Sequence, residues 1–92
     1  MIGLASRLQQ STGVLKQEVA GTVVLLNPDN GQYYSLDEVG GKIWDRCDGT
    51  HTVAEIASLL YQEYEVALDV LQADTLELLQ TLADERLVAE SR

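Results

Sequence analysis

The sequence predicts an α+β fold, in which an N-terminal three-stranded antiparallel sheet is followed by a three-helix bundle that carries a winged helix-turn-helix. Short apolar stretches at strand spacing fill the first third of the chain, and apolar residues recur at helical spacing after it. The turn sequence NPDNG, residues 27–31, separates two of the strands. A length of 92 residues suits one small domain, so sheet and helices are expected to share one core.

Three strands are expected before residue 37. Val14–Val19 has an imperfect alternation, and Thr22–Leu26 is apolar on both faces, as in a central strand covered on both sides. A tight turn at Ala20-Gly21 joins these two strands. The third strand, Gln32–Leu36, is short, follows the NPDNG turn and is expected at a sheet edge. Residues 1–13 have no clear period and are expected to form a loosely ordered lead-in.

The first helix is expected to begin at the capping box Ser35-x-x-Glu38, in which two side chains satisfy free main-chain N–H groups. Gly40 and Gly41 lie inside this helix, where each costs roughly 1 kcal/mol relative to Ala. Another backbone or a ring is therefore expected to pack closely there. The apolar stripe of this helix consists of Val39, Ile43, Trp44 and Cys47.

Two more helices follow. Asp48-Gly49 is expected to end the first helix, and the capping box Thr52-x-x-Glu55 opens the second. The last helix is predicted over Leu68–Asp84, and Leu87-Val88 is expected to form a short returning piece. The apolar arc of the last helix is wider than a surface helix requires. Its members are Leu68, Leu71, Thr75, Leu76, Leu78, Leu79 and Leu82.

The charge and the cysteine count exclude several classes of function. Six Lys and Arg against fifteen Asp and Glu give a formal charge of −9, which disfavours nucleic acid and anionic membranes as partners. One Cys and one His cannot form an internal disulfide or a zinc site of about four ligands. The longest apolar run, Val23–Leu26, is far shorter than the ~20 residues of a membrane helix. A cytoplasmic protein without a metal or cofactor is expected.

No catalytic group is indicated. Cys47 lies on an apolar stripe, which is typical of a buried structural thiol, and His51 lies in a polar loop before a helix. The paired acidic residues are typical of helix starts and solvated helix faces. A DNA-recognition helix would be basic, whereas Leu68–Asp84 is acidic. We therefore expect neither an enzyme nor a DNA-binding protein.

Two features suggest a peptide-binding surface. The unpaired main-chain groups of an edge strand at Gln32–Leu36 accept an incoming strand, and the wide apolar arc of the last helix provides a second wall. Together they form a groove for an extended peptide. The alternative is that the arc packs entirely against the other helices and that residues 1–13 cover the edge.

Three segments resemble a known family. They read LLNPDNGQYYSLDEVGGKIW (25–44), DGTHTVAEI (48–56) and YQEYEV (61–66), and they are similar to the PqqD-like family. Its members are the peptide-recognition domains (RiPP recognition elements) of pathways that make ribosomally synthesised, modified peptides. The strand YYSL and the following helix look most similar to the stand-alone leader-binding proteins of lasso peptide clusters. Residues that members commonly share are Gly31, Tyr33, Leu36, Gly40, Ile43, Trp44, Gly49, Ile56 and Tyr64.

The resemblance implies that residues 14–92 form a peptide-recognition domain with a three-stranded sheet and a winged-helix bundle. The leader segment of a precursor peptide would add as a strand beside the third strand, in a groove walled by the last helix. Tyr34 and Leu36 are expected to face the core, and Tyr33 is expected to lie over the leader. The strand residues implied in binding are Gln32, Tyr33, Tyr34, Ser35 and Leu36.

The family motifs do not determine the helix residues of the groove, so this assignment is our own. Small Ala73 would leave space, Leu76 would offer apolar contact, and Asp69 would meet a basic leader residue. Helical phase alone does not choose between the two margins of the arc. The favoured margin is Asp69, Gln72, Ala73, Leu76 and Gln80, and the other is Val70, Asp74 and Glu77.

The predicted function is a non-catalytic adaptor that delivers a precursor leader to other enzymes. In a lasso pathway, which is favoured, these are a leader peptidase and an ATP-dependent cyclase; in a pyrroloquinoline quinone pathway, the partner is a radical enzyme. The expected state is a monomer or a strand-exchanged dimer. The alternatives are a small acidic carrier protein modified on Ser35, an acidic transcription regulator, and a winged-helix interaction module that does not bind DNA.

Overall fold

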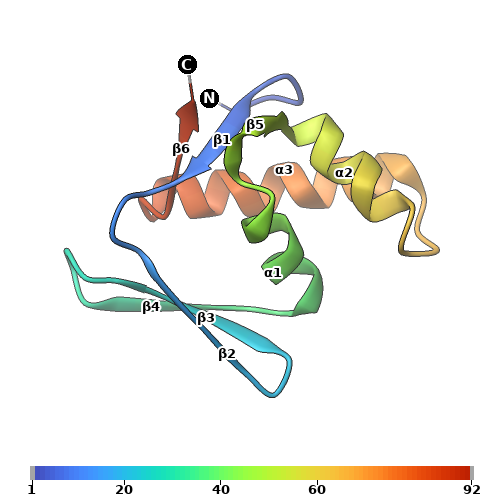
Figure 1. The fold of residues 1–92 in the computed structure, drawn as a ribbon. Helices are drawn as coiled ribbons and strands as arrows, with labels where there is room; N and C mark the ends of the chain where they lie inside the picture. The colour runs from blue at the N-terminus through green and yellow to red at the C-terminus, as the bar shows by residue number, and fades with distance from the viewer. Residues whose placement is uncertain (1, 92) are drawn as a thin grey trace.

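The computed structural model describes residues 2–91 as two three-stranded antiparallel sheets and three helices (Figure 1). This confirms the α+β class. None of the helices within residues 2–91 combines the length and the apolar character that crossing a membrane requires. The elements are β1 Arg7–Gln10, β2 Leu15–Val19, β3 Thr22–Asn27, β4 Gln32–Leu36, α1 Glu38–Asp45, β5 Asp48–Thr52, α2 Val53–Tyr61, α3 Leu68–Asp84 and β6 Val88–Ser91.

The sheet β2-β3-β4 is the predicted three-stranded meander, with β4 at an edge. Ala20 and Gly21 form a two-residue turn with φ of 51° and 83°, the left-handed conformation that a tight hairpin requires. On β3, Val23 and Leu25 are buried, whereas Val24 is only half-buried. The prediction that both faces of β3 are covered is therefore wrong, because α1 packs on one face only.

The second sheet, ordered β5-β1-β6, does not follow the sequence prediction. Residues 1–13 were expected to be loosely ordered, but β1 lies within them and pairs with two strands. Leu8 on β1 has 0% of its surface exposed, so this segment belongs to the core. Asp48–Thr52 was expected as a helix end and loop, and it forms β5 instead.

Helix α1 begins later and ends earlier than predicted. Its N-cap is Asp37 rather than Ser35, and the Asp37 Oδ1 atom accepts a 2.7 Å hydrogen bond from the Gly40 N–H. The expected close packing at the glycines is present. A Cβ built on Gly41 would lie 2.7 Å from the Val23 Cγ2 atom, so α1 approaches β3 as only Gly allows.

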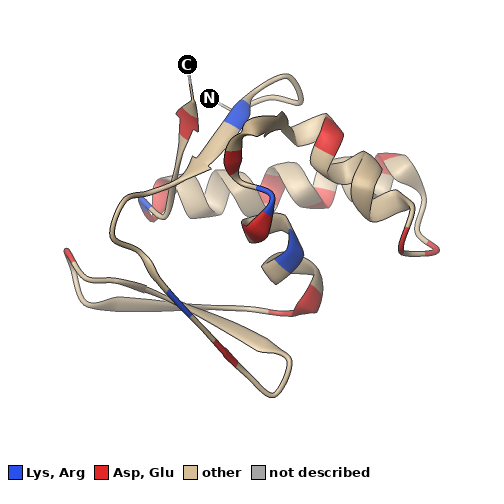
Figure 2. Ribbon diagram, in the orientation of Figure 1, with Lys and Arg blue, Asp and Glu red and all other residues tan. Residues whose placement is uncertain are grey.

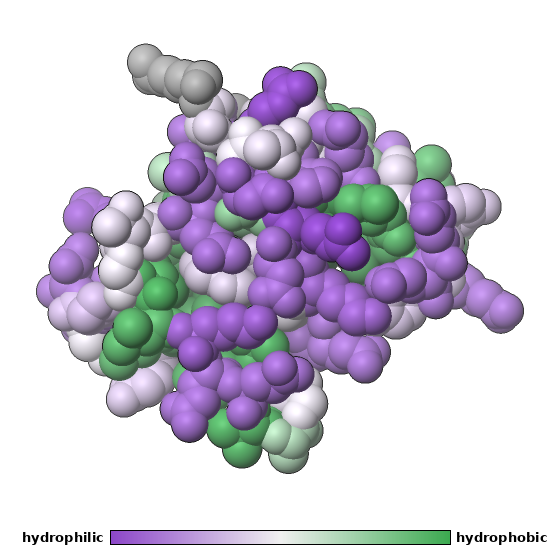
Figure 3. Space-filling view, viewed as in Figure 1, coloured by the Kyte–Doolittle hydropathy of each residue, from purple (hydrophilic) through white to green (hydrophobic). Residues whose placement is uncertain are grey.

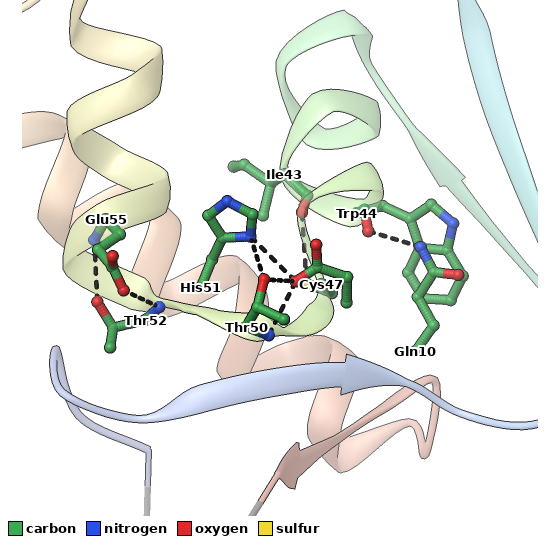
Figure 4. Close-up of polar contacts among 9 residues, drawn as sticks. Gln10, Ile43, Trp44, Cys47, Thr50, His51, Thr52 and Glu55 are labelled. Atoms are coloured by element: carbon green, nitrogen blue, oxygen red, sulfur yellow. Dashed lines mark hydrogen bonds and ion pairs between the residues drawn. The ribbon is translucent and has the colours of Figure 1, made fainter.

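The capping box of α2 is confirmed, since Thr52 and Glu55 exchange side-chain hydrogen bonds of 3.1 and 2.8 Å (Figure 4). Helix α3 has the predicted bounds. Helices α2 and α3 pack on each other, while α1 packs on the sheet of β3 and β4. Because β5 separates α1 from α2 and β6 follows α3, the expected order of one sheet and then three helices does not hold (Figure 1).

Candidate functional site

Strand β4 presents an edge that is unpaired within residues 2–91. It pairs with β3 alone, in a register that places Tyr33 opposite Leu26 and Tyr34 opposite Leu25. Leu36 is buried and Tyr34 half-buried, while Tyr33 lies on the opposite face with 71% of its surface exposed. Tyr34 and Leu36 thus face the core as predicted, whereas the contact of Tyr33 with a leader stays a prediction. The main chain of β4 is open to an added strand.

A groove of about 610 Å³ runs between β4 and α1 on one side and α3 on the other. Most of the exposed surface inside it is apolar, so it suits an apolar side chain of an extended ligand. Helix α3 contributes Leu71, Asp74 and Leu78. The other lining residues are Tyr34, Ser35, Leu36, Asp37, Val39, Gly40, Ile43, Tyr64 and Val66.

Polar contacts tie α1 to the segment between α2 and α3 at one end of the groove. The Tyr64 hydroxyl donates a 3.1 Å hydrogen bond to the Glu38 carboxylate, and the Lys42 ammonium lies 5.1 Å from the centre of the Tyr64 ring. Lys42 also pairs with Glu63 at 3.2 Å. The Tyr64 hydroxyl and the Glu63 carboxylate raise the pKa of Lys42. These contacts hold Tyr64 in place as a wall of the groove.

The charged residues that line the groove are both acidic. Asp37 uses one carboxylate oxygen to cap α1, whereas Asp74 is exposed on α3 and its carboxylate has no hydrogen bond or ion pair within residues 2–91. Asp74 is thus the charged group best placed to meet a cationic ligand.

The structure brings the predicted strand residues together with the groove but not the favoured residues of α3. Of the five strand residues, Tyr34, Ser35 and Leu36 line it. None of the favoured margin of α3 (Asp69, Gln72, Ala73, Leu76 and Gln80) is among the described residues that line it. The other margin contributes Asp74.

Most of the favoured α3 residues have other surroundings. Leu76 packs against the core, and the Asp69 carboxylate accepts a hydrogen bond from the N–H of Val70 on its own helix. Gln80 hydrogen-bonds to Asp84 and lines a different cavity beside β6.

Sequence reasoning missed the walls that come from α1 and from the segment after α2. Val39 and Ile43 were assigned to the apolar stripe of the first helix, because helical spacing marks all apolar positions alike. Gly40 was the one residue in the sequence that indicated a close approach between α1 and the strand beside the groove. A glycine inside a helix indicates a close neighbour, and a Cβ at Gly40 would lie 3.2 Å from the Leu36 Cβ atom of β4.

The groups considered for catalysis have structural roles. Cys47 is fully buried, and its thiol donates a 3.3 Å hydrogen bond to the Ile43 carbonyl (Figure 4). Burial, followed by the charges of Asp48 and Asp45, raises the pKa of Cys47 to about 12, so the reactive thiolate is disfavoured.

The remaining polar candidates also serve local structure. His51 lies 3.0 Å from the Asp48 carboxylate, which also accepts hydrogen bonds from Thr50. These hydrogen bonds hold the pKa of Asp48 well below its ordinary value. Within residues 2–91, no three His, Cys, Asp or Glu side chains cluster in a way that could hold a metal ion. Ser35, the attachment point in the carrier alternative, lies within an edge strand.

Known proteins similar to this chain were found by sequence. The family model of coenzyme PQQ synthesis protein D (PqqD) matches residues 22–88. A PqqA binding protein of Xanthomonas campestris pv. campestris (strain B100) is 35% identical over 65 residues, which cover 71% of this chain and 68% of that protein. The PqqA binding protein of Xanthomonas oryzae pv. oryzae (strain PXO99A) is 37% identical over the same length, with the same coverage.

Two solved structures share the fold. TbiB1 in complex with the TbiA(beta) leader peptide superposes with a TM-score of 0.78 and 30% identity, over 87% of this chain and 93% of that one. The PqqD truncation of Methylobacterium extorquens PqqCD, solved by NMR as a stand-alone RiPP recognition element, superposes with a TM-score of 0.82 and 26% identity, over 97% and 95%. With a family model that matches residues 22–88, the chain belongs to the PqqD family.

Proposed function

We propose that this protein is a non-catalytic adaptor that binds the leader segment of a ribosomally made precursor peptide. The observation that carries the proposal is the open edge of β4 beside the groove of about 610 Å³. Relatives support it, because two are named PqqA binding proteins and TbiB1 is structurally known with a leader peptide.

The leader adds to the sheet as a strand beside β4. Main-chain hydrogen bonds from β4 supply affinity that tolerates sequence changes, and alternate leader side chains enter the groove and supply specificity. Leu71 and Leu78 of α3 receive an apolar side chain, and Asp74 favours a basic residue nearby. This assignment replaces the Asp69 margin with Asp74 of the opposite margin, because Asp74 lines the groove and no residue of the Asp69 margin does.

The proposed cellular location and partner enzymes are those that the sequence predicts. The adaptor acts in the cytoplasm, where it presents the bound leader to a leader peptidase or another modifying enzyme of the pathway. We also propose that α2 and α3 form the helix-turn-helix of the predicted winged-helix fold, while α1 packs on the sheet of β3 and β4 rather than in a three-helix bundle. We favour a lasso peptide precursor as the ligand, as the sequence resemblance implies, and place a pyrroloquinoline quinone precursor second. The PqqA binding proteins among the relatives support the second type.

Titration calorimetry with the folded chain tests this function. The ligands are the leader peptides of a lasso precursor and of a PqqA precursor, together with the precursor encoded next to this chain. We expect a dissociation constant below about 100 µM for at least one of them. If a folded protein binds none of the three at that concentration, the proposal is wrong.

A matched pair of α3 variants tests which margin holds the leader. Asp74→Arg reverses a charge inside the groove, and Asp69→Arg makes the same change on the other margin. We expect Asp74→Arg to weaken leader binding by about tenfold or more, while Asp69→Arg leaves it unchanged. If Asp69→Arg weakens leader binding and Asp74→Arg does not, the leader contacts the Asp69 margin that the sequence favoured.

A further inference from the structure

The second edge of the sheet, β2, has no part in the function proposed above. Within residues 2–91 it pairs with β3 alone, and all five of its residues are exposed. Leu15 and Val19 keep 58% and 55% of their surfaces exposed. Figure 3 shows hydrophobic surface over the sheet of β2, β3 and β4. Such an edge is a template for pairing with another strand.

The pleat and the register place the β2 side chains on two faces. Leu15, Gln17 and Val19 lie on the outer face, because Leu15 is opposite half-buried Leu26 in the register. Lys16 and Glu18 lie on the face toward α1, where Lys16 pairs with Asp45 at 2.8 Å. The strand therefore has one uncharged face and one face with a single charge of each sign. Both charge colours appear along β2 in Figure 2.

The free main-chain groups of β2 come from its two charged residues. A two-residue turn closes on a pair that exchanges both main-chain hydrogen bonds, and here that pair is Val19 and Thr22. Since the pattern alternates along an antiparallel ladder, Glu18 and Lys16 turn their N–H and C=O groups toward the open side.

The sequence of β2, LKQEV, is complementary to itself in the antiparallel sense. Pairing two copies about Gln17 places Leu15 opposite the partner's Val19 and Lys16 opposite the partner's Glu18. The N–H and C=O groups of Lys16 and Glu18 that point away from β3 then hydrogen-bond to each other across the interface. A shift of one residue would place Leu15 opposite the partner's Glu18 and turn the apolar faces to opposite sides of the joined sheet. One register alone thus satisfies apolar contact, charge and main-chain pairing together.

We propose that the β2 edge is the interface of a symmetric homodimer, in which two copies join into one antiparallel six-stranded sheet. The two-fold axis passes Gln17, so each apolar and each charged pair occurs twice. No segment is exchanged between the copies. The two β4 edges lie at the ends of the joined sheet and stay free, so the dimer presents two grooves.

The dimer is weak and dynamic. Two five-residue strands bury far less than the roughly 1,200 Å² of a stable interface, and each copy carries a charge of −9 that repels the other. We expect a dissociation constant between about 10 µM and 1 mM at an ionic strength of about 0.15 M, where long-range repulsion is screened. A second copy is favoured as the occupant because the complementarity lies within this strand.

Sedimentation velocity of the full chain over that concentration range tests the proposal, with circular dichroism to confirm folding. We expect Lys16→Glu and Glu18→Lys each to weaken dimerisation by about tenfold, since each places like charges opposite one another in both symmetric pairs. The double variant restores opposite charges and the original net charge, and we expect it to recover the dimer. Glu65→Lys, on the exposed loop before α3, is the matched control and is expected to have no effect.

Three results would overturn the proposal. The first is a wild-type protein that stays monomeric up to about 1 mM. The second is charge reversals at Lys16 and Glu18 that leave dimerisation unchanged, and the third is a double variant that dimerises no better than the single variants. Leader titration with Glu18→Lys separates this edge from the peptide site. We expect leader affinity to be unchanged, and a loss would assign the β2 edge to the peptide rather than to a second copy.

Discussion

Cys47 shows how one buried side chain makes stability depend on pH. The thiol is fully buried at the end of α1, and burial raises its pKa from 9.0 to about 12. The neutral thiol is therefore favoured in the folded chain more than in the unfolded chain. Its contribution to stability is fully present below pH 9.0 and is lost as the pH rises toward 12.

Cys47→Ala tests this contribution. The substitution removes the thiol and leaves a small cavity, so it destabilises the protein at neutral pH. Because only the wild type loses the thiol contribution in alkali, we expect the gap in unfolding free energy between the two proteins to narrow from about pH 8 to about pH 11. Urea unfolding at several pH values measures the gap. A gap that stays constant over this range would contradict the assigned pKa of Cys47.

At the scale of single elements, the sequence prediction and the structure differ in the residue that caps the start of α1. Ser35-x-x-Glu38 and Asp37 are adjacent candidates for the N-cap, and both Ser and Asp are good capping residues. Ser35 is engaged in β4, which continues to Leu36, so its backbone cannot also begin the helix. Asp37 is the first residue free to do so, and its carboxylate caps the Gly40 N–H.

Replacing each candidate cap by Ala distinguishes them. We expect Asp37→Ala to lower the unfolding free energy by about 1 kcal/mol, because it removes the cap, and Asp37→Asn to retain most of the stability. Ser35→Ala is expected to change it by less than about 0.5 kcal/mol, since the side chain is exposed. Urea unfolding measures all three. A larger loss for Ser35→Ala than for Asp37→Ala would support the capping box that the sequence predicted.

Local signals made some elements predictable and left others hidden. Strands β3 and β4 and the second capping box depend on turns, alternation and end residues that lie within a few positions of one another. Strand β1 has four residues, and its pairing partners Thr52 and Ser91 lie far along the chain. No local pattern marks such a strand, because its stability comes from those distant pairs.

Part of the candidate site could likewise be predicted from local sequence signals, and part of it could not. The edge position of β4 could be predicted, since a short strand after a sharp turn at the end of a meander has one neighbour. The wall on α3 could not. Leu71, Leu76 and Leu78 of its apolar arc all belong to the core or pack against it, but only Leu71 and Leu78 also line the groove. Helical periodicity identifies the arc, but only the packing of α3 against its neighbours shows which side faces β4.

The whole molecule depends on its first strand to join distant parts of the chain. Strand β1 lies between β5 and β6 (Figure 1), so it connects the segment before α2 to the segment after α3. Gln10 adds a hydrogen bond of 2.8 Å from its side chain to the Trp44 carbonyl at the end of α1. The N-terminal residues are therefore a structural part of the domain rather than a lead-in to it.

Leu8→Ala tests this role against Leu4→Ala, which makes the same change outside the core. Leu8 has 0% of its surface exposed, and Leu4 has 39%. We expect Leu8→Ala to lower the unfolding free energy by about 2–5 kcal/mol, a large part of the roughly 5–15 kcal/mol of a typical domain. Leu4→Ala is expected to cost less than about 1 kcal/mol. Urea unfolding followed by circular dichroism measures both. Equal small losses would mean that residues 1–13 are the loosely ordered segment that the sequence predicted, and that the domain folds without them.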